Sequence, residues 1–181
     1  MKNANTKTIT TTALMAALVF VGTFFFKIPS PFGGYAHLGD CMIILAVCLL
    51  GTYRGAIAGA IGAGLSDLFG GYVVWVLPTA VIKGVWALLM GLFMYHMLKK
   101  FRFGWLVGAI VGGIAQIILY TLVKIPLYGA PGAFAEVPLL TGQTICGIVL
   151  GGVVYAILSR NAVWGKLRTM CQNKNFQESA E

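Results

Sequence analysis

Charged side chains are scarce in this sequence, and acidic ones are the scarcest. Only 10% of the 181 residues are charged, with 5 acidic and 13 basic side chains, whereas 59% are hydrophobic. Soluble domains carry about 25% charged residues. The composition therefore excludes an ordinary soluble protein, leaves no room for a soluble domain, and predicts a single integral membrane domain over residues 1–181.

The sequence also lacks the residue sets that carry out chemistry. The Gly-rich stretch GAIAGAIGAGLSD (55–67) has no Gly-Lys-Ser/Thr, so it is not a phosphate-binding loop. There is no His-Glu-x-x-His motif, and two isolated histidines do not make a zinc site. Four irregularly spaced cysteines indicate buried apolar side chains, not a disulfide framework. We expect no enzymatic activity, no metal and no cofactor.

Long apolar runs are what the sequence has instead. A membrane-spanning helix needs about 20 mostly apolar residues. The runs predict an all-α bundle of six transmembrane helices at about 8–27, 36–53, 55–71, 76–98, 104–125 and 137–159, followed by a basic tail at 160–181. The first run ends in FFFKIPSP without a small-residue cleavage site, so we interpret it as a retained helix.

The basic residues are distributed unevenly over the predicted connections. With six spans both termini share one side, and that side carries Lys2, Lys7, Arg54, Lys99, Lys100, Arg102, Arg160, Lys166, Arg168 and Lys174, whereas Lys27 and Lys124 flank the opposite, outer face. The positive-inside rule therefore places both termini in the cytoplasm, and a bacterial plasma membrane is the expected location. The net charge of +8 is then explained by topology, and we expect no nucleic-acid partner.

The opposite, outer connections are mostly longer and richer in Gly, Pro and aromatic residues. They cover about 27–36, 71–76 and 125–137. Long irregular loops carry function more often than short turns do. We therefore expect the functional face of the molecule to point outward.

Intramembrane polar residues cluster at the same depth, in the outer halves of the predicted spans. A rise of 1.5 Å per residue places there the side chains of Asp40, Asp67, Lys83, Gln116, Tyr120 and Gln143. Ionisable groups in a bilayer are costly and mark functional sites by default. The pattern predicts a polar cavity open to the outside, near His37 at the mouth of the second span.

Each of these residues also has a purely structural interpretation. Asp40, Asp67 and Lys83 could form salt bridges that brace three helices, and His37 could be hydrogen-bonded within its loop. The outer aromatic residues could form an interfacial belt, which would comprise Tyr35, Tyr72, Trp75 and Tyr128. Tyr72 and Trp75 could also stack on a flat ligand. Glu136, the acid of the last outer loop, could be solvated or could contact a lid.

Three motifs together resemble a known family. They are GGYAHLGDCMIILAVCLLG (33–51), GAIAGAIGAGLSDLFGGY (55–72) and LPTAVIKG (77–84). They resemble the substrate-binding S components of energy-coupling factor (ECF) vitamin transporters, which are ABC-type importers. The closest resemblance is to the riboflavin-type branch, which includes proteins assigned to pyridoxine or hydroxymethylpyrimidine uptake, and it extends over essentially the whole chain.

The resemblance implies a division of labour between subunits. In this family an Ala-x-x-x-Ala pattern on the first helix docks on the transmembrane coupling subunit, and here Ala13 and Ala17 supply it, with Ala16 beside them. Substrate enters from outside, into a pocket closed by the first, third and fifth loops. Two separate ATPase subunits hydrolyse ATP, and transport is proposed to involve toppling of the whole S component in the membrane.

The sequence leaves the substrate open. A small aromatic heterocycle such as pyridoxine or hydroxymethylpyrimidine suits a compact polar pocket, whereas riboflavin suits the branch label but needs more room. A self-sufficient secondary transporter, coupled to protons or sodium through Asp40, Asp67 or His37, is an alternative of another class. Such transporters usually show internal repeats or broken helices, and the sequence has no convincing repeat.

Overall fold

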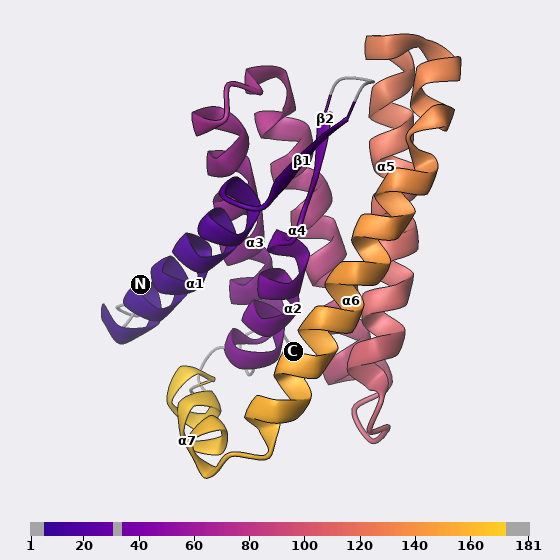
Figure 1. The fold of residues 1–181 in the computed structure, drawn as a ribbon. Helices are drawn as coiled ribbons and strands as arrows, with labels where there is room; N and C mark the ends of the chain where they lie inside the picture. Colours follow the sequence, from indigo (N-terminus) through magenta and orange to yellow (C-terminus); the bar gives the residue numbers. More distant parts are fainter. Residues whose placement is uncertain (1–5, 31–33, 173–181) are drawn as a thin grey trace.

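Helices make up most of the protein (Figure 1). The computed structural model describes residues 6–30 and 34–172. The helices are α1 (Thr6–Phe24), α2 (Gly39–Leu50), α3 (Thr52–Phe69), α4 (Val76–Leu92), α5 (Gly104–Ala135), α6 (Val137–Ser159) and α7 (Ala162–Cys171). A 3-10 turn at Val73–Trp75 precedes α4, and a π-helical turn at Phe93–Met97 follows it.

The short helix α2 occupies the centre of the bundle. It packs against α1, α3, α4 and α6, and its residues Ile43, Ile44, Ala46, Val47 and Cys48 are all at most 1% exposed. A helix that is apolar on every side is stable only when it is surrounded by other elements. Helix α2, with 12 residues, is shorter than the span expected at 36–53, because strand β2 extends to His37 and Gly51, with a φ of 90°, ends the helix.

The longer helices present apolar side chains outward. Four segments of the described chain are long and apolar enough to cross a bilayer, namely α1, Val73–Met97, α5 and α6. Large exposed side chains along them include Leu14, Ile118 and Val153. An apolar exterior of this kind suits contact with lipid. The sequence predicts six spans, whereas this criterion of length and composition identifies four among the described residues.

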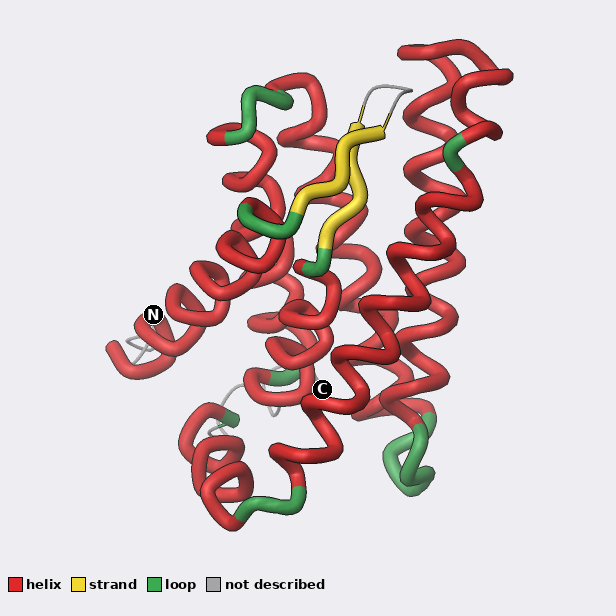
Figure 2. Tube along the Cα trace, in the orientation of Figure 1, coloured by secondary structure: helices red, strands yellow, loops and turns green. Residues whose placement is uncertain are grey.

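Two antiparallel strands lie where the second predicted helix was expected to begin (Figure 2). Strand β1 (Lys27–Ser30) pairs with β2 (Gly34–His37), with Lys27 opposite His37. Pro29 disfavours helical dihedrals at the residue before it, and this keeps the segment extended. Residues 36–38, which the sequence placed in a helix, therefore belong to the hairpin and its exit.

Helix α5 is longer than predicted, and it bends near its end. The region 125–137 was expected to be an irregular loop, but helical structure continues to Ala135. The bend lies at Gly129, whose φ of 76° and ψ of 161° are not helical. Glycine adopts positive φ without steric cost. The bend and Pro131 just after it turn the chain toward α6.

Helix α7 packs under the bundle, at the end opposite the hairpin (Figure 1). Trp164 and Cys171 are buried, and the guanidinium of Arg54 donates to the carbonyl oxygen of Cys171. The Gln172 amide nitrogen donates to the carbonyl of Cys48, at 3.3 Å. The first part of the predicted basic tail is thus a packed helix, and residues 173–181 lie outside the described part of the chain.

Candidate functional site

A buried polar network joins four helices around Asp40, in the first turn of α2. The Asp40 carboxylate accepts hydrogen bonds from Lys83 Nζ at 2.5 Å, from Gln143 Nε2 at 3.0 Å and from Gln116 Nε2 at 3.3 Å. Lys83 also donates to Gln116 Oε1 at 2.8 Å, and Gln116 donates to Thr144 Oγ1 at 3.0 Å. Asp40, Lys83 and Gln116 are completely buried. Each charge is therefore matched by an opposite charge and by further hydrogen bonds.

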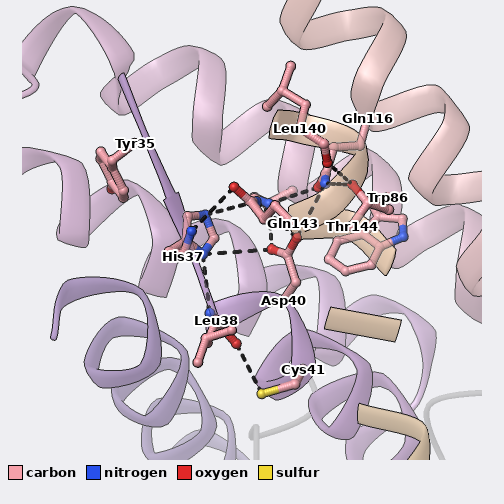
Figure 3. Close-up of polar contacts among 12 residues, drawn as sticks. Tyr35, His37, Leu38, Asp40, Cys41, Trp86, Gln116, Leu140, Gln143 and Thr144 are labelled. Atoms are coloured by element: carbon pink, nitrogen blue, oxygen red, sulfur yellow. Dashed lines mark hydrogen bonds and ion pairs between the residues drawn. The ribbon is translucent and has the colours of Figure 1, made fainter. Parts of the chain in front are cut away.

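The network depends on a close approach of α2 to α6. A Cβ atom built on Gly147 would lie 2.5 Å from Asp40 Cβ, which is closer than real side chains come. Glycine at this position lets Asp40 sit directly beside Gln143, one helical turn away on α6. Figure 3 shows the Asp40 carboxylate facing Gln143 and His37.

A pocket lies next to this network, between the hairpin and the ends of α3, α4, α5 and α6 nearest to it. Its empty volume is about 410 Å³ when the open space at its mouth is counted, so the enclosed part is smaller. Seven residues that the sequence singled out line it, namely Tyr35, His37, Asp67, Tyr72, Trp75, Tyr120 and Gln143. Three further lining residues were not singled out, namely Thr79, Lys124 and Leu140.

The other four predicted site residues lie elsewhere. Asp40, Lys83 and Gln116 are behind the pocket wall, and they contact it through Gln143. Glu136 forms an ion pair with Lys124 and accepts a hydrogen bond from the Ser30 hydroxyl. Their predicted depth placed Asp40, Lys83 and Gln116 near one another, as their hydrogen bonds also do, but it said nothing of which way each side chain points.

Aromatic rings form two sides of the pocket. Trp75 stacks on Tyr128, with ring centroids 6.2 Å apart and planes 9° apart, and its indole N–H donates to the Tyr128 hydroxyl at 3.1 Å. Tyr35 and Tyr72 are in contact, with centroids 4.8 Å apart. Tyr35, Tyr72 and Trp75 line the pocket, whereas Tyr128 is exposed and lies against Trp75.

Asp67 is separate from the Asp40 network. Its Oδ1 accepts a hydrogen bond from the Tyr35 hydroxyl, which ties the hairpin to α3. Burial, and then the nearby Asp67 charge, raise the pKa of Tyr35, so its phenol remains a donor. Lys27 strengthens the same junction, because its Nζ donates to the Ser66 carbonyl at 3.2 Å and lies 4.4 Å from the Tyr35 ring centroid.

His37 is neutral and held on both sides. Its backbone N–H donates to Gln143 Oε1 at 3.3 Å, and its Nδ1 accepts from the Gly39 backbone N–H at 3.2 Å. Burial, followed by the positive charge of Lys83, lowers the pKa of His37 to about 3. The hydrogen bonds reach α6 and the start of α2, so the ring is fixed in orientation beside the pocket.

Lys124 is the main lining residue that the sequence analysis passed over. It was counted as a basic residue marking the outer face, which hid its position on α5. Gln116, Tyr120 and Lys124 follow one another at four-residue spacing and share one helix face, and this spacing is the signal that identifies it. Among the described residues, no group of three His, Cys, Asp or Glu side chains is placed to hold a metal ion.

A second concave surface lies between α1 and α3. It is an almost wholly apolar groove that contains Ala13, Ala16 and Ala17. Ala13 and Ala17 are exposed, whereas Ala16 is buried. The two alanines of the Ala-x-x-x-Ala pattern therefore lie open on the surface.

Comparisons with known proteins agree on one family. Residues 3–160 match the model of the family described as "ECF-type riboflavin transporter, S component". An uncharacterised protein of the gap 3' region of Pyrococcus woesei is 38% identical over 143 residues, which cover 78% of this chain and 95% of that one. The thiamine precursor transporter HmpT of Lactococcus lactis is 34% identical over 170 residues, covering 93% of this chain and 97% of that one.

A solved structure has the same fold. It is described as the S component of a bacterial ECF transporter, and it superposes with a TM-score of 0.71 at 22% identity over 85% of this chain and 96% of that one. The family match extends from α1 to the end of α6. The chain belongs to the family of ECF-type riboflavin transporter S components, integral membrane proteins that bind the substrate of a vitamin transporter.

Proposed function

We propose that this S component captures hydroxymethylpyrimidine, the pyrimidine precursor of thiamine, from outside the cell. The observation that carries the proposal is the similarity to a thiamine precursor transporter along 93% of this chain. The pocket supports it, because its aromatic walls and buried polar groups suit one small, flat, polar ring. Pyridoxine is of similar size and is the nearest competitor.

Riboflavin is the second candidate cargo. The description of the matching family favours it. Its three fused rings and ribityl chain need more space than a single ring, and the enclosed part of the pocket, which is smaller than the 410 Å³ that includes the mouth, favours the smaller cargo.

The remaining parts of the transport cycle follow from the family. We propose six spans with cytoplasmic termini, in which α2 and α3 join the four longer segments. The exposed Ala13 and Ala17 dock on the transmembrane coupling subunit, and two ATPase subunits supply the energy. The hairpin and the connection around Glu136 close the pocket after the substrate enters.

Ligand binding to the purified full-length chain in detergent tests the cargo. Trp75 lines the pocket, so its fluorescence reports occupancy, and calorimetry gives the affinity. We expect saturable binding of hydroxymethylpyrimidine and binding at least tenfold weaker for pyridoxine, thiamine and riboflavin. If riboflavin or pyridoxine binds more tightly, that compound is the cargo and the proposal of hydroxymethylpyrimidine is wrong. Uptake by cells that lack the ATPase subunits would contradict the ECF mechanism.

A further inference from the structure

The pocket wall contains one carboxylate oxygen whose hydrogen-bonding capacity is not used. Asp67 is 2% exposed and lines the pocket. Its Oδ1 is bonded to the Tyr35 hydroxyl, whereas its Oδ2 has no hydrogen-bond partner among the described residues. The Thr79 side chain lies beside the same carboxylate. A buried oxygen left without a donor is costly, and a ligand that offers an N–H or O–H there removes that cost.

His37, on the same side of the pocket, offers a hydrogen-bond donor where Asp67 offers an acceptor. Its Nδ1 lone pair accepts the Gly39 N–H, so the neutral ring carries its proton on Nε2. The Gln143 amide is also fixed, because its Oε1 accepts from the His37 backbone and its Nε2 donates to Asp40. With the proton on His37 Nε2, its 3.4 Å contact with Gln143 Nε2 is not a hydrogen bond, and both atoms carry N–H groups on residues that line the pocket.

Tyr35 brings these two sides together. Its hydroxyl contacts Asp67, and its ring lies 5.6 Å from the His37 ring, centroid to centroid. One acceptor and a pair of donors thus flank a single aromatic side chain. A flat ring lying against Tyr35 meets both.

We propose that this pocket selects an amino-substituted nitrogen heterocycle, with Asp67 Oδ2 accepting the exocyclic amino group and His37 Nε2 donating to a ring nitrogen. The inference rests on the proposed function and adds the chemical feature that is recognised. It separates hydroxymethylpyrimidine, which has an amino group beside a ring nitrogen, from pyridoxine, which has none. Asp67 and His37 are then residues that determine specificity, distinct from the Asp40 network.

Calorimetry on the wild-type chain with four ligands tests the inference without any mutation. They are hydroxymethylpyrimidine, the analogue with hydrogen in place of the amino group, the analogue with a carbonyl oxygen there, and the analogue with CH in place of the neighbouring ring nitrogen. Each analogue loses a hydrogen bond to a buried group, so we expect affinity to fall by about 10- to 100-fold.

An acid-to-amide change then tests Asp67 itself. Asp67→Asn keeps an acceptor for Tyr35 but presents an NH₂ group in place of Oδ2. We expect the preference for the amino compound over the carbonyl analogue to be lost, because the Asn NH₂ donates to the carbonyl oxygen, although the protonated ring nitrogen of that analogue still gives up the hydrogen bond from His37. Tyr35→Phe is the matched control, because it leaves the polarity of Oδ2 unchanged and should preserve the ligand order.

The outcomes separate this inference from the proposed function. If wild-type protein binds the amino and deamino compounds within twofold of each other, the inference is wrong and the cargo stands. If folded wild-type protein binds no pyrimidine, the proposed cargo fails and the inference fails with it. Loss of discrimination in Asp67→Asn, with preserved discrimination in Tyr35→Phe, supports both.

Discussion

The Asp40–Lys83 pair is buried in a place where charges are normally excluded. Both side chains are fully buried, and the pair is 2.5 Å apart. Removing one member of such a pair leaves an uncompensated charge, which typically costs about 3–5 kcal/mol of stability. The pair does not line the pocket, so its first role is to hold α2 and α4 together.

We therefore expect Asp40→Asn and Lys83→Met each to destabilise the protein by about 3–5 kcal/mol. The double variant should lose less than the sum, since neither charge is then left alone. Thermal unfolding in detergent, followed by the fluorescence of the buried tryptophans, measures this. Single variants that unfold at the same temperature as the wild type would show that the pair does not brace the bundle.

The lowered pKa of His37 predicts that the stability of the folded protein depends on pH. Its pKa is lowered to about 3 in the folded protein, chiefly by burial and then by Lys83, against about 6.5 in the unfolded chain. Asp40, Lys27 and Gln143 are its other charged or polar neighbours. Below pH 6.5 the unfolded chain binds a proton that the folded protein does not, so the contribution of His37 is complete above pH 6.5 and falls as the pH drops toward 3.

The expected slope is at most about 1.4 kcal/mol per pH unit between pH 6 and 4. Unfolding of wild type and His37→Gln across this range isolates it from the other titrating groups. The second histidine, His96, is exposed and provides the control His96→Gln, which should keep the wild-type slope. Parallel curves for wild type and His37→Gln would contradict the expectation.

At the scale of elements, the hairpin and the end of α5 meet over the pocket. Glu136 follows α5 directly, accepts from Ser30 at the end of β1, and pairs with Lys124 on the pocket wall. Glu136 and Lys124 are both at most 4% exposed. This contact fastens the hairpin to the helical connection, and it must open for a ligand to leave by the pocket mouth.

Glu136→Gln should therefore speed ligand dissociation by about tenfold, because a buried charged hydrogen bond is worth more than a neutral one. Ser30→Ala removes only the hairpin contact and should have a smaller effect. Stopped-flow fluorescence, in which bound ligand is displaced by an excess of a competitor, gives both rates. Dissociation as slow as in wild type would mean that this contact is not part of the closure.

The elements differ in how far the sequence predicts them. Helix α6 begins and ends at the residues expected for the last apolar run, 137 and 159, because Pro138 fits its first turn. A hydropathy analysis does not detect the hairpin, since four-residue strands such as Lys27–Ser30 are too short to show a periodic pattern. Hydropathy does not predict the extension of α5 either, because Pro126 and Gly129 indicate a loop when the packing of the neighbouring helices is unknown.

The site shows the same division. Asp40, Asp67 and Lys83 are predicted from the sequence to lie near the same end of the bundle, and so is a pocket close to them. Their partners are not, because rotation about each helix axis decides that Asp40 faces Lys83 while Asp67 faces Tyr35. Lys124 was assigned to topology because a single lysine near a span end satisfies the charge rule equally well.

At the scale of the whole molecule, the pocket and the proposed docking groove are different surfaces. The pocket lies under the hairpin, whereas the apolar groove with Ala13 and Ala17 runs along α1 and α3. A side chain that fills the groove should block partner docking without touching the pocket.

Ala17→Trp should therefore abolish vitamin uptake by cells that carry the coupling module, with ligand affinity of the purified subunit within twofold of wild type. Leu18→Trp is the matched control: Leu18 is 41% exposed on the same helix but is not among the groove residues. Co-purification with the coupling subunit provides the direct readout. Equal uptake by the two variants would contradict docking through the alanines.

The central position of α2 also bears on whether ions can pass through the molecule. Beneath the pocket, the bundle axis is filled by Ile43, Ile44 and Val47, each at most 1% exposed. A column of aliphatic side chains closes the bundle at this level, so we expect the isolated subunit to carry no ionic current. We then expect the cargo to leave through the opening by which it entered, and import to bring that opening to the other side of the membrane.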